Sequence, residues 1–122
     1  MNGEVAVEHR EGVAVARLSG DVDISRAVAL RAELMRAISN QEFGLVLDMR
    51  DVAYLDSAGV NVLFELAERL ASRQQQLMAV VPDNALIERV IALVNLRSVM
   101  PTHPTVDEAV AAVRALAPTG DS

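Results

Sequence analysis

The sequence contains no cysteine and no lysine, and each absence removes several mechanisms at once. Without cysteine the chain has no disulfide framework, no thiolate zinc site and no cysteine nucleophile, which fits the reducing cytoplasm, the compartment we expect. Without lysine it lacks the ammonium group on which a Walker phosphate loop, a Schiff base and a receiver-type aspartate switch each depend. Asp48 ends an apolar run as a receiver aspartate does, but without a lysine we do not expect it to be phosphorylated.

Aromatic residues make up only 2% of the sequence, although 52% of it is hydrophobic. The core must therefore be built from aliphatic side chains and methionine. A chain of 122 residues has room for one compact core. We expect a single domain over residues 1–116 and a flexible C-terminal tail over residues 117–122.

The chain also lacks a basic stripe and a long apolar run. Its 11 basic residues are all arginines, scattered singly from Arg10 to Arg114, and its net charge is −6. Such a surface cannot neutralise a row of phosphates, so we expect no direct nucleic-acid binding. No apolar stretch reaches the ~18 residues needed to span a bilayer, and the polar N-terminus does not resemble a secretory signal. We therefore expect no membrane insertion.

Hydrophobic periodicity predicts an alternation of strands and helices. The chain opens with two β-prone runs separated by Glu11-Gly12, which is typical of a hairpin. The alternating part that follows favours parallel strands covered by helices on both faces. We expect an α/β fold with a mixed, mostly parallel sheet of four to five strands and about four helices. The expected strands are residues 5–8, 13–18, 45–47, 77–81 and an edge strand at 98–100; the expected helices are residues 25–39, 57–73, one capped by Asp83 or Asn84, and one opened by a Thr105 capping box.

Two loops at the carboxyl ends of the expected strands, residues 20–25 and 51–59, form the candidate functional surface. In the second loop, Asp56-Ser57-Ala58-Gly59 stands at the entrance to a helix, where free N–H groups and the helix dipole favour a phosphate on Ser57. Asp56 or Ser57 serving merely as the helix N-cap is an equally open interpretation. The missing side chain of Gly59 would let a partner or a loop backbone approach Ser57 closely.

The first loop carries Asp21 and Asp23, which sheet geometry brings near Ser57. The alternative is again helix capping, by Asp23 or by Ser25, and for any one of these residues it is at least as open.

A hydrolase site is not expected, because the nucleophile elbow needs a glycine where this chain has Leu55. The two histidines, His9 and His103, stand alone in the sequence and form neither a triad nor a metal cluster. We therefore expect no enzymatic activity and no bound metal or cofactor.

The segments Leu18-Ser19-Gly20-Asp21-Val22-Asp23 and LVLDMRDVAYLDSAGVNVL, which starts at Leu45, resemble the STAS domains of bacterial anti-sigma factor antagonists. The resemblance covers nearly the whole chain, and the two motifs occur together at the family's usual separation. It implies the STAS fold, with Ser57 as the serine phosphorylated by a partner anti-sigma factor kinase and Asp23 as the loop aspartate. Ala58 stands where the family frequently has a second serine, and Asn61 where it often has glycine. The expected partner-binding residues are Asp21, Asp23, Ser25, Asp56, Ser57, Ala58, Gly59 and Asn61.

The resemblance also implies a cycle. The unphosphorylated domain binds the anti-sigma factor kinase and frees its sigma factor, phosphorylation of Ser57 ends the binding, and a serine phosphatase resets the domain. The kinase supplies ATP and magnesium, so this chain needs no cofactor of its own. Two other roles of STAS domains remain open, as the accessory subunit of a lipid-transport ATPase or as part of a stress-sensing assembly, and neighbouring genes would separate them from the switch. A third alternative, a small phosphate-handling hydrolase, requires activity in the purified protein alone.

Overall fold

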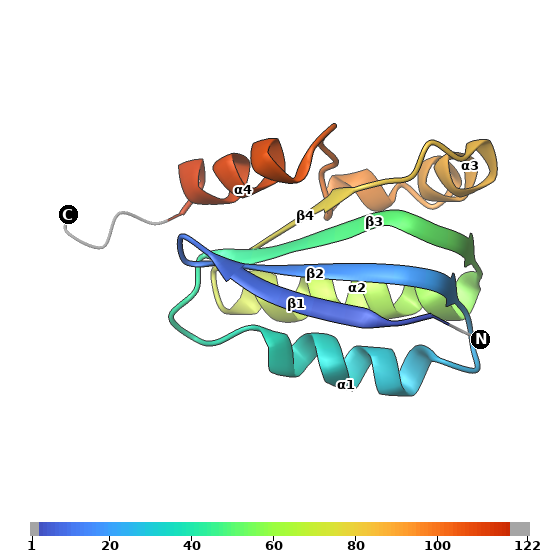
Figure 1. Ribbon diagram of the computed structural model, residues 1–122, viewed down its shortest axis with the longest axis horizontal. Coiled ribbons are helices and arrows are strands. Elements are labelled where there is room, and N and C mark those ends of the chain that lie inside the picture. The colour runs from blue at the N-terminus through green and yellow to red at the C-terminus, as the bar shows by residue number, and fades with distance from the viewer. Residues whose placement is uncertain (1–2, 118–122) are drawn as a thin grey trace.

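The computed structural model describes residues 3–117, in which four strands form one mixed sheet with helices on both faces (Figure 1). Along the chain the elements are β1 (Val5–Arg10), β2 (Val13–Val22), α1 (Ala27–Ala37), β3 (Gly44–Leu55), α2 (Ser57–Ser72), β4 (Gln76–Val80), α3 (Ala85–Leu93), the 3-10 helix η1 (Leu96–Ser98) and α4 (Val106–Ala115). The strand order is β1-β2-β3-β4, and only the β1–β2 pair is antiparallel within this described sheet. The predicted α/β fold with a mostly parallel sheet and four helices is confirmed.

The hairpin between β1 and β2 turns at Glu11 and Gly12, whose φ angles are 55° and 82°. Two successive residues with positive φ are what a two-residue hairpin turn requires, because this backbone twist matches that of the flanking strands. The predicted hairpin is therefore confirmed, and it sets the register in which Arg10 pairs with Val13.

The main core lies on the face of the sheet covered by α1, α2 and α3. Its largest fully buried side chains are leucine, methionine and isoleucine, as the shortage of aromatic residues predicts. Burying each such side chain contributes roughly 1.5–3 kcal/mol. In α1 and α2 the buried positions recur every three or four residues, for example Leu30 and Leu34 in α1, so one stripe of each helix faces the sheet.

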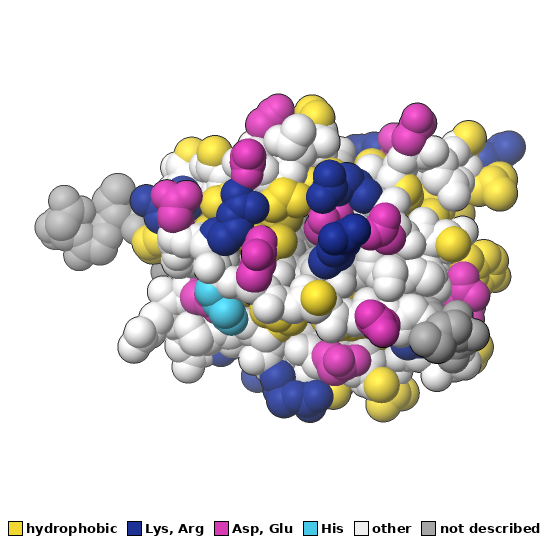
Figure 2. All heavy atoms as spheres, viewed as in Figure 1, with side chains coloured by type: hydrophobic (Ala, Val, Ile, Leu, Met, Phe, Trp, Pro, Cys, Tyr) yellow, Lys and Arg dark blue, Asp and Glu magenta, His cyan; other side chains and the backbone are white. Residues whose placement is uncertain are grey.

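The opposite face is covered by α4 alone among the described helices, over the starts of β2 and β3 and the length of β4. Beyond α4 this face is open and carries Arg17, Asp48 and Arg50. Figure 2 shows basic and acidic side chains interspersed on the visible side of the molecule, without a large basic patch there. Across residues 3–117, none of the helices combines the length and the hydropathy needed to cross a bilayer.

Two expectations about the elements are wrong. The strands β2 and β3 continue to Val22 and Leu55, so much of the two predicted loops is strand. The expected edge strand at residues 98–100 is absent from the described chain, because η1 and a bend occupy this stretch. The edge of β4 is instead covered by the following segment, in which Pro101 accepts a hydrogen bond from the amide of Ala79 (3.0 Å). Most of the expected tail, residues 118–122, lies outside the described residues.

Candidate functional site

The candidate surface forms where β2 and β3 end side by side (Figure 1). Parallel pairing places Asp21 beside Tyr54 and Val22 beside Leu55. The amide of Asp56 donates to the carbonyl of Val22 at 3.3 Å. The entrances to α1 and α2 are therefore brought together at one end of the sheet, as the sequence predicts.

Asp56 is the N-cap of α2. Its Oδ1 accepts a hydrogen bond from the amide of Gly59 at 3.0 Å, and its Oδ2 accepts one from the amide of Ile24 at 3.3 Å. The same carboxylate thus closes the first turn of α2 and holds the loop that follows β2. Between the two capping candidates left open by the sequence, the structure selects Asp56.

Ser57 is the first residue of α2 and is exposed. Its hydroxyl makes no hydrogen bond to any residue in the described range 3–117. The first amides of a helix have no acceptor within the helix and give this end a partial positive charge, which favours an anionic group. The side chain is accessible and chemically uncommitted, as a phosphate acceptor needs to be.

The loop from Asp23 to Arg26 is an Asx turn. The carboxylate of Asp23 accepts hydrogen bonds from the amide of Ser25 at 3.1 Å and from its hydroxyl at 2.6 Å. The helix α1 begins later, at Ala27, and its N-cap residue Arg26 provides no side-chain cap. The interpretation of Asp23 or Ser25 as the cap of α1 is therefore wrong, and both residues act within the turn.

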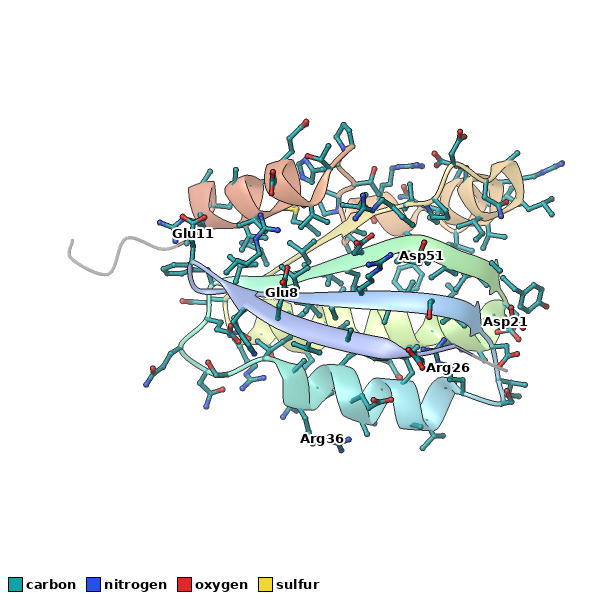
Figure 3. All side chains as sticks on the ribbon, in the orientation of Figure 1. Glu8, Glu11, Asp21, Arg26, Arg36 and Asp51 are labelled. Atoms are coloured by element: carbon teal, nitrogen blue, oxygen red, sulfur yellow. The ribbon has the colours of Figure 1, made fainter. Side chains whose placement is uncertain are left out.

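Arg26 is a site residue that the sequence did not indicate. It is buried, and its Nη1 donates to the backbone carbonyls of Ser19 at 2.8 Å and Asp21 at 2.9 Å. Figure 3 shows it at the start of α1, on the side of Asp21. It fixes the irregular end of β2, where the pairing register with β3 shifts. An arginine at the edge of an amphipathic helix looks like a solvated side chain, so only the fold discloses this role.

Gly59 is buried beneath the loop after β2. A Cβ added here would lie 2.3 Å from the carbonyl oxygen of Val22 and 2.9 Å from Leu55. The close approach expected at this glycine is made by the backbone of Val22 at the end of β2, so Gly59 acts through packing. Next to Ser57, Ala58 is partly buried, whereas Asn61 is exposed one helical turn further on.

Three large apolar side chains of the two segments that meet here are exposed, and the sequence pattern did not single them out. Ile24 is 78% exposed, Val28 is 85% exposed and Tyr54 is 51% exposed. Ile24 is tied to Asp56 by the hydrogen bond described above, Val28 lies one turn beyond it in chain order, and Tyr54 precedes Asp56 by two residues. Large apolar side chains exposed in this way occur on protein-binding surfaces.

The histidines lie elsewhere. His9 in β1 contacts Glu42 through its Nδ1 at 2.6 Å, and His103 follows the segment at the edge of β4. In the part of the chain that the structure describes, no three His, Cys, Asp or Glu side chains come together in a way that could hold a metal ion.

Fold and surface together define a small mixed α/β interaction domain with a serine presented at a helix entrance. The chain belongs to the STAS domain family, whose family model matches residues 4–109. This confirms the resemblance drawn from the two motifs.

The chain is similar to proteins of Paenibacillus and Mycobacterium. The chain is 28% identical over 104 residues to the anti-sigma F factor antagonist of Paenibacillus polymyxa, covering 84% of this chain and 88% of that protein. It is 28% identical over 110 residues to the anti-sigma-F factor antagonist RsfB of Mycobacterium tuberculosis, covering 90% and 88%. The crystal structure of an anti-sigma factor antagonist from Mycobacterium paratuberculosis superposes with a TM-score of 0.79 at 30% identity, covering 93% of this chain and 95% of that one.

Proposed function

We propose that this protein is an anti-sigma factor antagonist controlled by phosphorylation of Ser57. In its unphosphorylated form it binds an anti-sigma factor kinase and frees the sigma factor. One observation carries the proposal: Ser57 is exposed at the first position of α2, and the N-cap of this helix is the neighbouring Asp56. The Ser57 hydroxyl is therefore not needed as a helix cap and is available for phosphorylation. The names of the relatives in Paenibacillus and Mycobacterium support the same role.

The partner surface combines the serine with its apolar neighbours. Ile24, Val28 and Tyr54 offer area that gains from being removed from water, at roughly 25 cal/mol per Å². Asn61, one turn along α2 from Ser57, supplies an exposed amide. Asp23 adds a carboxylate that is fixed by its turn rather than free to rotate.

Phosphorylation ends binding through charge. A phosphoserine carries about −1.5 to −2 charges at neutral pH. On Ser57 these charges would lie next to the Asp56 carboxylate, and the loop of Asp23 is tied to that same carboxylate through Ile24. Within a packed interface the added charge meets repulsion and loses its hydration, so the bound state is destabilised more than the free one.

The rest of the cycle belongs to the partners. A serine kinase of the anti-sigma type supplies ATP and magnesium, and a serine phosphatase restores the hydroxyl, both in the cytoplasm. In this proposal the chain itself catalyses nothing; it is the substrate of both enzymes.

Affinity purification from the native cell tests the proposal. A tagged wild-type chain should recover an anti-sigma factor kinase, and mass spectrometry should find phosphate on Ser57. Ser72, an exposed serine at the far end of the same helix, serves as the internal control and should stay unmodified. Recovery of a transporter ATPase, with Ser57 unmodified under every growth condition, would instead identify an accessory subunit and contradict the switch.

A further inference from the structure

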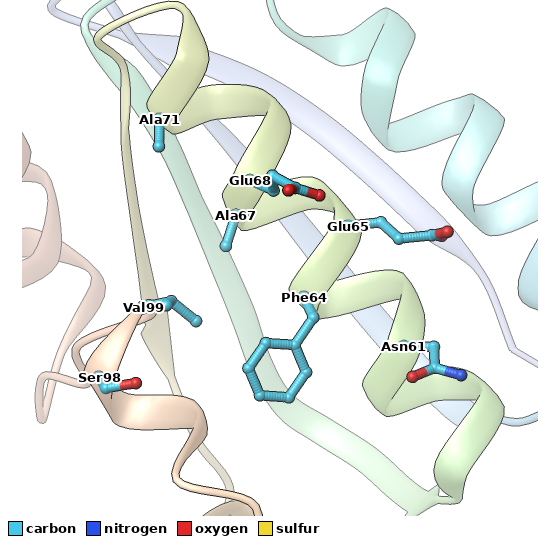
Figure 4. A pocket seen from close by; sticks show the side chains of 8 residues that line it. All are labelled: Asn61, Phe64, Glu65, Ala67, Glu68, Ala71, Ser98 and Val99. Atoms are coloured by element: carbon cyan, nitrogen blue, oxygen red, sulfur yellow. The ribbon is translucent and has the colours of Figure 1, made fainter.

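A groove of about 700 Å³ runs along α2, on the side that faces η1 (Figure 4). Phe64, Ala67 and Ala71 point from the helix toward Val99, which follows η1. The groove exists because Ala67 and Ala71, on two successive turns of α2, have small side chains that fill little of the space between α2 and Val99. Phe64 and Val99 make its walls apolar, and Val99 is 41% exposed.

The rim of this groove is acidic and is continuous with the phosphorylation site. Asn61, Glu65 and Glu68 follow Ser57 by four, eight and eleven residues, so all four side chains lie on one stripe of the helix. At ~1.5 Å per residue, the distance along the axis from Ser57 to Glu68 is about 17 Å. Any partner that covers Ser57 and continues along α2 meets the groove next.

The charge of the rim limits what can bind there. Glu65 is partly neutralised by Arg31 of α1 at 3.3 Å. Glu68 forms no ion pair with any residue in the described part of the chain. A second copy of this chain would set like charges against each other, and an anionic lipid or nucleotide would be repelled. The matching occupant has an apolar side chain for the hollow and a basic group for Glu68.

We propose that the groove is a second docking site for the kinase that phosphorylates Ser57. An amphipathic segment of that kinase places an apolar side chain between Phe64 and Val99 and an arginine or lysine against Glu68. This inference rests on the proposed function and adds the means by which the kinase selects its substrate. Because the groove lies away from the reacting hydroxyl, it contributes to the binding of the substrate and leaves the chemical step unchanged.

The test uses steady-state phosphorylation of the full chain by the purified kinase that modifies Ser57. Val99→Glu places a charge in the groove, and Val7→Glu is the matched control, since Val7 of β1 is 42% exposed against 41% for Val99. We expect Val99→Glu to raise KM at least tenfold with kcat unchanged, and Val7→Glu to behave as wild type. Glu68→Arg should raise KM as well, whereas Glu33→Arg on the exposed side of α1 should not.

Melting curves establish that each variant is folded, and Ala71→Glu replaces Val99→Glu if that variant is not. A KM for the groove variants within twofold of wild type overturns the docking site and leaves the Ser57 switch standing. An equal rise in KM for Val7→Glu overturns it too. A wild-type chain that no kinase phosphorylates overturns the proposed function, and the groove assignment with it.

Discussion

The carboxylate of Asp56 joins two segments that lie 32 residues apart, the loop after β2 and the first turn of α2. Replacing it with alanine removes the N-cap and the bond to Ile24 together. We expect Asp56→Ala to lower the free energy of unfolding by about 1 kcal/mol, the usual effect of losing a cap. The phosphorylation rate should fall as well, because the loop beside Ser57 loses its anchor.

Thermal unfolding and a phosphorylation assay measure both effects. The control is Asp83→Ala: Asp83 is exposed near the start of α3, where the neighbouring Asn84 is the cap. If Asp56→Ala melts at the wild-type temperature, the hydrogen bonds of Asp56 to the amides of Ile24 and Gly59 do not stabilise the fold, and the prediction is wrong.

Asp48 is an acid in the middle of the sheet whose side chain is only 5% exposed. Two hydrogen bonds from the Arg50 guanidinium lower the pKa of Asp48 below its ordinary value, and burial opposes this shift only in part. A carboxyl with a lowered folded pKa stabilises the protein fully above its unfolded pKa of about 3.9. That contribution is lost as the pH falls through the folded pKa.

Arg50→Gln should therefore destabilise the fold by about 2 kcal/mol near neutral pH, because a buried carboxylate loses its charged partner. The difference from wild type should shrink as the pH falls below the ordinary aspartate pKa of about 3.9, because protonation of Asp48 removes the charge that Arg50 stabilises. Urea unfolding at several pH values measures this. The control Arg17→Gln breaks a pair with Asp51 in which both side chains are largely exposed, 62% and 44%, and should change little. A pH-independent loss in Arg50→Gln would contradict the assignment to Asp48.

At the scale of elements, the packing of α2 against the end of β2 depends on the absence of a side chain at Gly59. A methyl group there meets a backbone carbonyl of Val22, which cannot move aside as a side chain could. We expect Gly59→Ala to destabilise the protein by roughly 1–3 kcal/mol, the range for overpacked positions. Partner binding should weaken because the loop shifts, rather than because a contact with the partner is lost.

Asn61→Ala, on the exposed side of the same helix, is the control for Gly59→Ala and should melt as wild type does. For both variants we compare the melting temperature with the affinity for the kinase. A loss of both in Gly59→Ala indicates a packing effect, whereas a loss of affinity at an unchanged melting temperature indicates a lost contact with the partner. Wild-type stability of Gly59→Ala would contradict this prediction, because it would show that the backbone at Val22 can make space for a methyl group.

Helix starts were predictable from the sequence where a capping residue acts locally. Thr105 accepts from the amide of Glu108 at 3.0 Å, as the capping box predicts, and Asn84 caps α3 as one of two expected candidates. Strand ends were not predictable from the sequence. The second half of β3 contains charged residues, which are uncommon in a strand of a covered sheet. Those charges are accommodated by tertiary pairs, such as Arg17 with Asp51 at 2.6 Å.

The candidate site was predictable in position but only partly in composition. The motif places Ser57 and Asp56 correctly at the entrance to a helix. The exposure of Ile24 and Val28 could not be predicted, because it depends on how α1 packs against the sheet. The bonds that Arg26 makes to strand carbonyls likewise exist only in the folded chain.

At the scale of the whole molecule, the proposed phosphorylation site and the proposed docking groove both involve α2. Ser57 and the residues of α2 that line the groove follow one another along a single helix, in a chain whose net charge is −6. In the proposed switch, a phosphate on Ser57 would add negative charge to a helix that already carries Glu65 and Glu68, so we expect one modification to lower the affinity of the whole surface for its partner.

The most direct measurement of this account is a calorimetric titration of the anti-sigma factor kinase with four proteins. These are wild type, Ser57→Ala, Ser57→Glu and wild type phosphorylated at Ser57, with intact mass confirming one added phosphate on wild type and none on Ser57→Ala. We expect Ser57→Ala to bind as wild type does and the phosphorylated protein to bind at least tenfold more weakly, which corresponds to ~1.4 kcal/mol. Ser57→Glu should fall between them, since a carboxylate carries less charge than a phosphate. Phosphate on Ser57→Ala, or equal affinities for all four proteins, would contradict the switch.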